Sequence, residues 1–130
     1  MNQSTTAVIS EILTVAAGHA EKNWDGEGAE PVSAVAVDRA VAFVRALPAG
    51  VLPEVAAEPD GAISLDWMQS RTRVLSISVG LGERLALAWI DGEDQGHAVA
   101  VFDGERIPPR VLAGIRGMGA RSYSEFMEFL

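Results

Sequence analysis

Residues 59–79 read PDGAISLDWMQSRTRVLSISV, and apolar and polar side chains alternate along two segments of this stretch. A period of two is typical of extended chain with one buried face. The apolar face of both segments carries Ile63, Leu65, Trp67, Leu75, Ile77 and Val79. Pro59-Asp60-Gly61 ahead of them predicts a turn, because Pro fixes φ and Gly accepts a positive φ. The stretch therefore predicts two neighbouring strands of an antiparallel sheet.

The same pattern continues on both sides of this stretch. It predicts strands at 55–58, 62–68, 73–79, 85–90 and 96–102, with turns at 80–82 and 91–94. The opposite face of this sheet would carry small or polar residues, namely Ser64, Asp66, Ser76, Ser78, Ala86 and Ala88. One apolar face and one wettable face are typical of an antiparallel sheet.

Helices are predicted on either side of the strands. A first helix covers residues 5–20, with its apolar stripe at Ile9, Ile12, Leu13, Ala16, Ala17 and Ala20. A second helix has Pro31 in its first turn and ends near Leu47. Its stripe is Val37, Ala40, Val41, Val44 and Leu47. A third helix starts near Pro108-Pro109, and the capping-box spacing from Ser122 to Glu125 predicts a further short one.

These elements predict one α+β domain over residues 1–130. Two N-terminal helices pack on an antiparallel meander of about five strands, and one or two short C-terminal helices follow. A chain of 130 residues fits one domain. It has no cysteine, so disulfides, thiolate metal ligands and a cysteine nucleophile are excluded.

Compartment and partner class follow from charge and hydropathy. Residues 1–7 hold no Lys or Arg, and no apolar run approaches the roughly 20 residues of a bilayer span, so we expect a cytoplasmic protein without membrane contact. The net charge is −8, and residues 1–70 carry 10 acids but only 3 bases. Such a chain is not expected to bind nucleic acid directly. It would suit a basic protein partner, although solubility alone also explains the charge.

The loop Asn23-Trp24-Asp25-Gly26-Glu27-Gly28-Ala29-Glu30 lies between the two N-terminal helices, as a calcium loop would. With Asn23 in the first position, the twelfth is Ala34, which offers no oxygen ligand, so an EF-hand is excluded. We predict a structural loop instead. Trp24 plugs the gap between helices and sheet, Asp25 closes an Asx-type turn and the glycines supply positive φ. A weak divalent-ion site around Asp25, Glu27 and Glu30 is the alternative.

Catalytic motifs are lacking. His19 and His97 are the only histidines, and no G-x-S-x-G segment exists. Gly80-Leu81-Gly82 lacks the third glycine and the following helix of a dinucleotide loop. We therefore assign no catalytic residue, no cofactor and no metal ligand.

Aromatic residues gather at the C-terminus, where Tyr123, Phe126 and Phe129 either dock on the chain's own core or meet another chain. We take them, together with Trp24, Asp25, Glu27 and Glu30, as candidate partner-binding residues. The small face of the sheet offers a further contact, because such a surface permits close packing in a homodimer.

Two motifs carry a resemblance to a family. The segment from Asn23 to Pro31 and the hairpin Pro59-Asp60-Gly61 with Ile63, Leu65 and Trp67 resemble those of a family of small, uncharacterised bacterial and phage proteins. These share a W-D-G-x-G-A-x-P segment and a P-D-G-x-I-x-L-x-W hairpin, and the helix start at Ile107-Pro108 fits as well. The likeness covers about residues 20–117. It implies the same fold and a bacterial or phage origin, without an activity to carry over.

The sequence thus predicts a non-enzymatic, acidic protein-binding module, comparable to an antitoxin, an immunity protein or a phage inhibitor. Two alternatives stay open. One is a structural or accessory homo-oligomer. The other is an enzyme with carboxylate chemistry, metal-assisted or not, around Asp25, Glu27 and Glu30.

Overall fold

The computed structural model describes residues 4–128, with side chains from 4 to 118. The helices are α1 (Thr5–Gly18), α2 (Ala34–Ala46) and α3 (Pro109–Glu128). The strands are β1 (Glu54–Ala57), β2 (Ile63–Ser70), β3 (Arg73–Val79), β4 (Arg84–Asp91) and β5 (Asp94–Val101). This arrangement confirms the predicted α+β class and the order of its elements. No helix in the described part is both long and apolar enough to cross a membrane.

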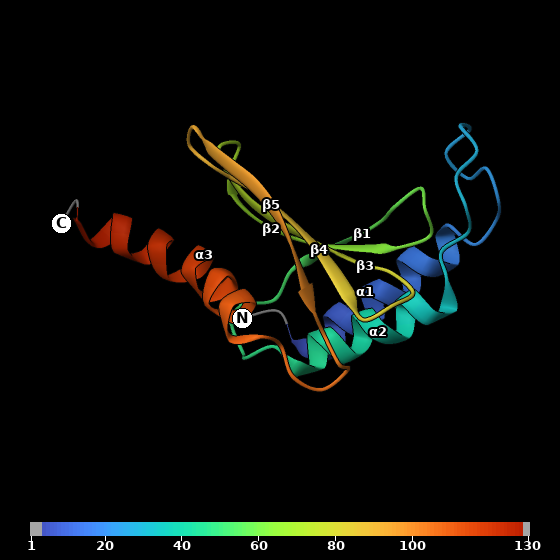
Figure 1. Ribbon diagram of the computed structural model, residues 1–130, viewed down its shortest axis with the longest axis horizontal. Helices are drawn as coiled ribbons and strands as arrows, with labels where there is room; N and C mark the ends of the chain where they lie inside the picture. Colours follow the sequence, from blue (N-terminus) through green and yellow to red (C-terminus); the bar gives the residue numbers. More distant parts are fainter. Residues whose placement is uncertain (1–3, 129–130) are drawn as a thin grey trace.

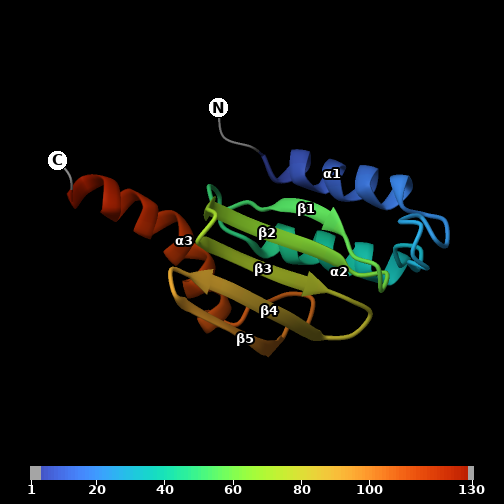
Figure 2. The same ribbon diagram turned by 90° about the horizontal axis from the view of Figure 1, so that it is seen from above.

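The five strands form one antiparallel meander in chain order, β1-β2-β3-β4-β5 (Figure 2). The register places Leu65 opposite Ile77, and Ile77 opposite Leu87, so the apolar residues share one face. On the other face Ser64, Ser78 and Ala86 form one cross-strand row, and Asp66, Ser76 and Ala88 form the next. The predicted two-faced sheet is confirmed.

Helices α1 and α2 lie on the same face of the sheet, with α1 beside β1 (Figures 1 and 2). Ala36 and Ala40 of α2 are fully buried, and their small side chains let the helix approach the strands. Phe43 of α2 meets Phe102, which follows β5, in an edge-to-face contact with ring centroids 5.2 Å apart. Each large apolar side chain buried here stabilises the fold by about 1.5–3 kcal/mol.

The predicted apolar stripes of the two helices are confirmed only in part. In α1 the fully buried residues are Val8 and Ile12, whereas Leu13 is 54% exposed. In the second stripe, Ala40, Val44 and Leu47 are buried as predicted, and Ala36 and Phe43 of α2, which lie outside the predicted stripe, are fully buried as well. Both helices are rich in Ala and Val on several sides, so two neighbouring stripes have similar hydropathy, and the contact with the sheet selects one of them.

The start of α2 also differs from the prediction. Pro31 lies before the helix, because Ser33 is the N-cap and its Oγ accepts hydrogen bonds from the backbone N–H groups of Val35 and Ala36. The chain before this cap is held elsewhere, since the backbone N–H of Val32 donates to the carbonyl of His19.

The C-terminal part forms one helix rather than two. Because α3 continues from Pro109 to Glu128, Ser122 lies inside it and caps no helix of its own. A Ser and a Glu three residues apart also occur within helices, so the spacing alone does not mark a start.

Candidate functional site

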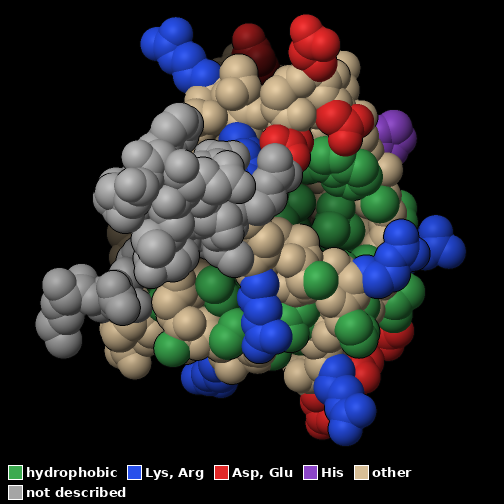
Figure 3. Space-filling model, turned by 90° about the vertical axis from the view of Figure 1, so that its left-hand side faces the viewer, with side chains coloured by type: hydrophobic (Ala, Val, Ile, Leu, Met, Phe, Trp, Pro, Cys, Tyr) green, Lys and Arg blue, Asp and Glu red, His purple; other side chains and the backbone are tan. Residues whose placement is uncertain are grey.

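An apolar hollow lies between the first half of α3 and the β3–β5 end of the sheet, and we call it the α3 groove. Its volume is about 740 Å³. The sheet contributes residues of β3, β4 and β5, namely Arg73, Val74, Leu75, Leu87, Trp89, Ile90, Asp91, Ala98, Val99, Ala100 and Val101. The helix α3 with its preceding residue contributes Pro108, Arg110, Val111, Gly114, Gly117 and Met118. Figure 3 shows hydrophobic side chains in a hollow on this side, with charged side chains around it. Part of the predicted core face therefore stays accessible.

The floor of the α3 groove depends on a glycine. Gly96 of β5 lies directly opposite Trp89 of β4. A Cβ atom added to Gly96 would lie 2.4 Å from Cζ2 of the Trp89 indole, closer than any real contact. The ring therefore lies against the bare backbone of β5, which a side chain at position 96 would prevent.

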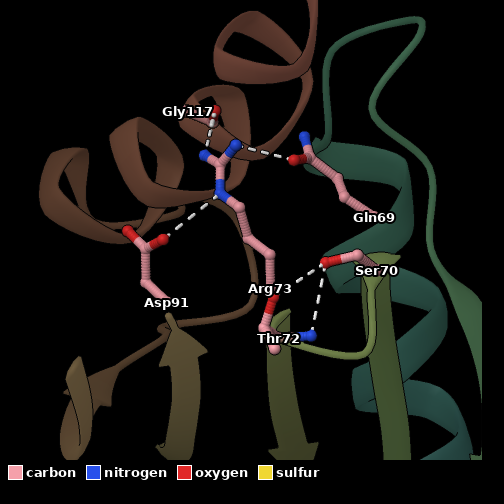
Figure 4. Close-up of polar contacts among 6 residues, drawn as sticks. All are labelled: Gln69, Ser70, Thr72, Arg73, Asp91 and Gly117. Carbon is pink, nitrogen blue, oxygen red and sulfur yellow. Dashed lines mark hydrogen bonds and ion pairs between the residues drawn. The ribbon is translucent and has the colours of Figure 1, made fainter. Parts of the chain in front are cut away.

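One buried arginine, Arg73, connects the sheet wall of the groove to its helix wall (Figure 4). We call the contacts around it the Arg73 corner. The Arg73 side chain, only 9% exposed, starts β3 and points toward α3. Its Nη1 donates to Oε1 of Gln69 at 2.6 Å, and its Nη2 donates to the backbone carbonyl of Gly117 at 3.1 Å. Its Nε lies 3.8 Å from Oδ1 of Asp91. These contacts join three strands to α3 and so fix where the helix lies.

The chemistry available in the α3 groove is limited. Its ionisable lining residues are Arg73, Asp91 and Arg110, and the first two pair with each other. The remaining described lining residues are aliphatic, Trp, Met, Gly or Pro. A groove of this kind suits apolar groups, with the exposed Arg110 as a charge among its described lining residues.

The acidic loop has the structural role that the sequence predicts. Oδ1 of Asp25 accepts hydrogen bonds from the backbone N–H groups of Glu27 at 2.8 Å and Ala29 at 3.0 Å. The donation from Glu27, foremost, holds the pKa of the Asp25 carboxyl below its usual value. Gly26 and Gly28 have positive φ. The expected Asx-type turn and the expected role of the glycines are confirmed.

Trp24 does not lie where it was predicted. Its ring is half-buried and packs edge-on against His19, with centroids 4.5 Å apart. Its Nε1 donates to the backbone carbonyl of Glu30 at 2.8 Å. The prediction that Trp24 fills the gap between the helices and the sheet is therefore wrong. The loop instead packs on itself and on the end of α1.

The loop carboxylates do not gather around a common point. Both hydrogen bonds to Oδ1 occupy Asp25 within the loop, and Glu30 lies 3.6 Å from the Nζ of Lys22. Among the residues that the structure describes, no three His, Asp or Glu side chains are placed to share a metal ion. The geometry thus offers no support for the alternative of a divalent-ion site here.

The candidate partner-binding residues fall into two groups. Trp24, Asp25, Glu27 and Glu30 share one loop, at the opposite end of the sheet from α3 (Figure 2). Tyr123, Phe126 and Phe129 lie outside the residues whose side chains are described. The α3 groove was missed. Its available signal was the run of small residues Gly96, Ala98 and Ala100 on the strand paired with Leu87 and Trp89.

Comparison with known proteins adds no relative, because no protein-family model, curated protein or solved structure matches the chain. The likeness of its loop and hairpin motifs to small bacterial and phage proteins thus stays a prediction.

Proposed function

We propose that the chain is a non-enzymatic protein-binding module that holds an apolar segment of another protein in the α3 groove. The observation that carries this proposal is the size and lining of the groove. From Pro108 to Met118 its helical wall spans about 15 Å at the usual rise per residue. That length suits two or three turns of an amphipathic helix, and laying an apolar helix face into a groove is a common mode of recognition.

The acidic loop and the neighbouring Pro59 turn give this proposal a second line of support. The loop and the Pro59 turn are joined by the hydrogen bond from the Glu30 N–H to the Pro59 carbonyl at 2.8 Å. Together they form an acidic end, in which Lys22 pairs with Glu30 and the acids are Glu21, Asp25, Glu27, Glu30, Glu58 and Asp60. An acidic end would speed the approach of a basic protein through long-range attraction, while the groove would supply the affinity. An antitoxin, an immunity protein or a phage inhibitor would combine the two in this way.

The enzymatic alternative has less support. A nucleophile or general base must lie within hydrogen-bonding reach of a substrate. The described lining of the α3 groove contains no His, Ser, Thr or Glu, and the one carboxylate, Asp91, lies beside Arg73. Asp25 is held by backbone N–H groups of its own loop.

The test uses two adjacent positions of α3. Gly114 lines the groove, and a Cβ atom added there meets no atom within 4 Å, so Gly114→Glu should fold and even favour the helix. Ala113 is also exposed but does not line the groove, so Ala113→Glu is a control with the same change in net charge.

The tagged full-length chain is used to capture partners from nuclease-treated bacterial lysate, and the bound protein is identified by mass spectrometry. We expect one stoichiometric partner that Gly114→Glu weakens by at least about tenfold, because a carboxylate would face apolar groups. Ala113→Glu should retain it. Equal capture by both variants, or no partner at all, would contradict the proposal.

A further inference from the structure

The face of the sheet that points away from α1 and α2, which we call the open face, is covered by no helix in the part of the chain that the structure describes (Figure 2). The residues at its centre are small, namely Ser64, Ser76, Ser78, Ala86 and Ala88. The hydroxyl of Ser64 donates to Oδ1 of Asp66 at 2.7 Å, and that of Ser78 donates to Oε2 of Glu58 at 2.5 Å. Because these hydroxyl groups are paired within the chain, a surface that covers them leaves them satisfied. Small side chains also let a second sheet approach closely.

The open face also carries a protruding side chain and a hollow. Met68 of β2 protrudes and is 67% exposed. The hollow has a volume of about 620 Å³, and its outward-facing lining residues are Val74, Ala88, Ile90, Gln95 and His97. Val74 and Ile90 also border the α3 groove, but they alternate with Leu75 and Trp89, so their side chains point to the open face. The register sets Met68 beside Val74, and Val74 beside Ile90, so the protruding residue and the hollow lie on opposite sides of β3.

The charges of the open face are also divided at β3. The outward residues of β1 and β2 include two acids, Glu54 and Asp66. The outward residues of β4 and β5 contain no acid, and they are Arg84, Ala86, Ala88, Ile90, Gln95, His97, Val99 and Val101. Arg84 is a cation, and the His97 ring carries an N–H that can donate to a carboxylate in either charge state. One half of the open face is therefore acidic, and the other half complements it.

Symmetry decides how two such faces meet. A two-fold axis that runs along β3, between two facing sheets, lays β2 of one copy on β4 of the other and β1 on β5. Each cross-strand row then lies against the same row of the second copy. Met68 enters the hollow of the second copy beside Ile90, and Glu54 faces His97, each twice. An axis across the strands would lay β1 on β1 and β2 on β2, so the acidic halves would face each other.

We propose that two copies of the chain form a dimer through the open face, with Met68 of each copy in the hollow of the other. Protruding residue, hollow and charges all fit a second copy under one two-fold operation. The dimer does not rest on the proposed function of the α3 groove, because the groove lies on the helix side of the sheet and the open face on the other.

The first test changes the protruding residue. Sedimentation of the full-length chain over a concentration series gives the dimer dissociation constant, and circular dichroism checks the fold. Met68→Glu would set a carboxylate against Val74 and Ile90 of the second copy, so we expect a dimer at least about tenfold weaker than that of the wild type. The control is Leu13→Glu, at a residue of α1 that is 54% exposed, which makes the same change in net charge and should leave the dimer unchanged.

The second test exchanges the facing charges. His97→Glu should weaken the dimer, because the new carboxylate faces Glu54 of the second copy, and adding Glu54→Lys should restore it. Adding Glu21→Lys instead gives the same net charge at an exposed residue outside the open face, so this variant should stay weak.

Three results would overturn the proposal. One is a wild type that stays monomeric at its highest soluble concentration. Another is a dimer that neither Met68→Glu nor His97→Glu weakens, which would place the contact on a different surface. The third is a dimer that Gly114→Glu weakens as strongly as Met68→Glu does, which would place the contact in the α3 groove. A dimer with the expected pattern, in a chain that captures no partner, supports the dimer and contradicts only the proposed function.

Discussion

At the scale of single residues, the shape of the α3 groove depends on where a side chain is absent. Gly96 allows the indole of Trp89 to lie across the backbone of β5, and the half-buried ring forms part of the groove floor. Gly82 is different, because no atom lies within 4 Å of a Cβ built there. Packing against Trp89 therefore requires a glycine at position 96, whereas no neighbouring atom requires one at position 82.

We expect Gly96→Ala to lower the free energy of unfolding by about 1–3 kcal/mol, because the new methyl group and the Trp89 ring cannot share one place. Gly82→Ala should change it by less than about 0.5 kcal/mol. Urea unfolding of the three proteins measures both values. Equal stability of the two variants would show that Trp89 moves aside at no cost.

At the scale of elements, α3 relies on the sheet for its stability. Gly114 and Gly117 lie in the first half of α3, and each glycine costs a helix interior about 1 kcal/mol relative to alanine. Packing of Val111, Ile115 and Met118 compensates for this weakness, and so do the hydrogen bonds of the Arg73 corner. The helix and the groove wall that it forms should thus depend on a residue of β3.

Arg73→Met should lower the free energy of unfolding by about 2 kcal/mol, because the Gln69 amide oxygen and the Gly117 carbonyl lose a buried donor. Amide hydrogen exchange at residues 111–118 should accelerate more than exchange in β2. The control is Arg84→Met, an exposed arginine of β4, which should leave both unchanged. If exchange rises equally everywhere, Arg73 supports the whole fold rather than the docking of α3.

At the scale of the whole molecule, the contact between Phe43 and Phe102 joins helix α2 to the segment that directly follows the edge strand β5. Both rings are fully buried. Arg39 of α2 also reaches this point, since its Nη2 donates to the carbonyl of Phe102 and its guanidinium lies 5.7 Å from the ring centroid. Residues 59 positions apart in the sequence thus share one core, so helices and sheet should unfold together.

A double-mutant cycle tests this link. Phe43→Ala and Phe102→Ala should each cost about 3–5 kcal/mol, and the double variant should cost less than their sum by about 0.5–1.5 kcal/mol, the usual coupling of an edge-to-face pair. Chemical unfolding followed by circular dichroism and by tryptophan fluorescence should give one coincident transition. Additive costs, or separate transitions, would mean that the two layers are independent.

Local features of the sequence determined the sheet and its turns. Side chains on a strand alternate between faces whatever the rest of the chain does, so Ile63, Leu65 and Trp67 predicted a buried face directly. The turn at Gly61 has the expected positive φ, and Pro31 O would lie 2.9 Å from any Cβ there. The Asx-type turn at Asp25 is likewise a contact between near neighbours, and near neighbours are what a sequence pattern describes.

Only the tertiary structure decided which face of α1 is buried, where Trp24 packs and where the α3 groove lies. Leu13 and Val8 are both apolar, and only the position of the sheet makes one exposed and the other buried. The groove exists because α1 and α2 cover one part of the apolar face, while Arg73 holds Gly117 at another. Contacts between residues so distant in the sequence produce no periodic pattern or motif in the sequence, because each contact depends on how whole helices and strands are placed.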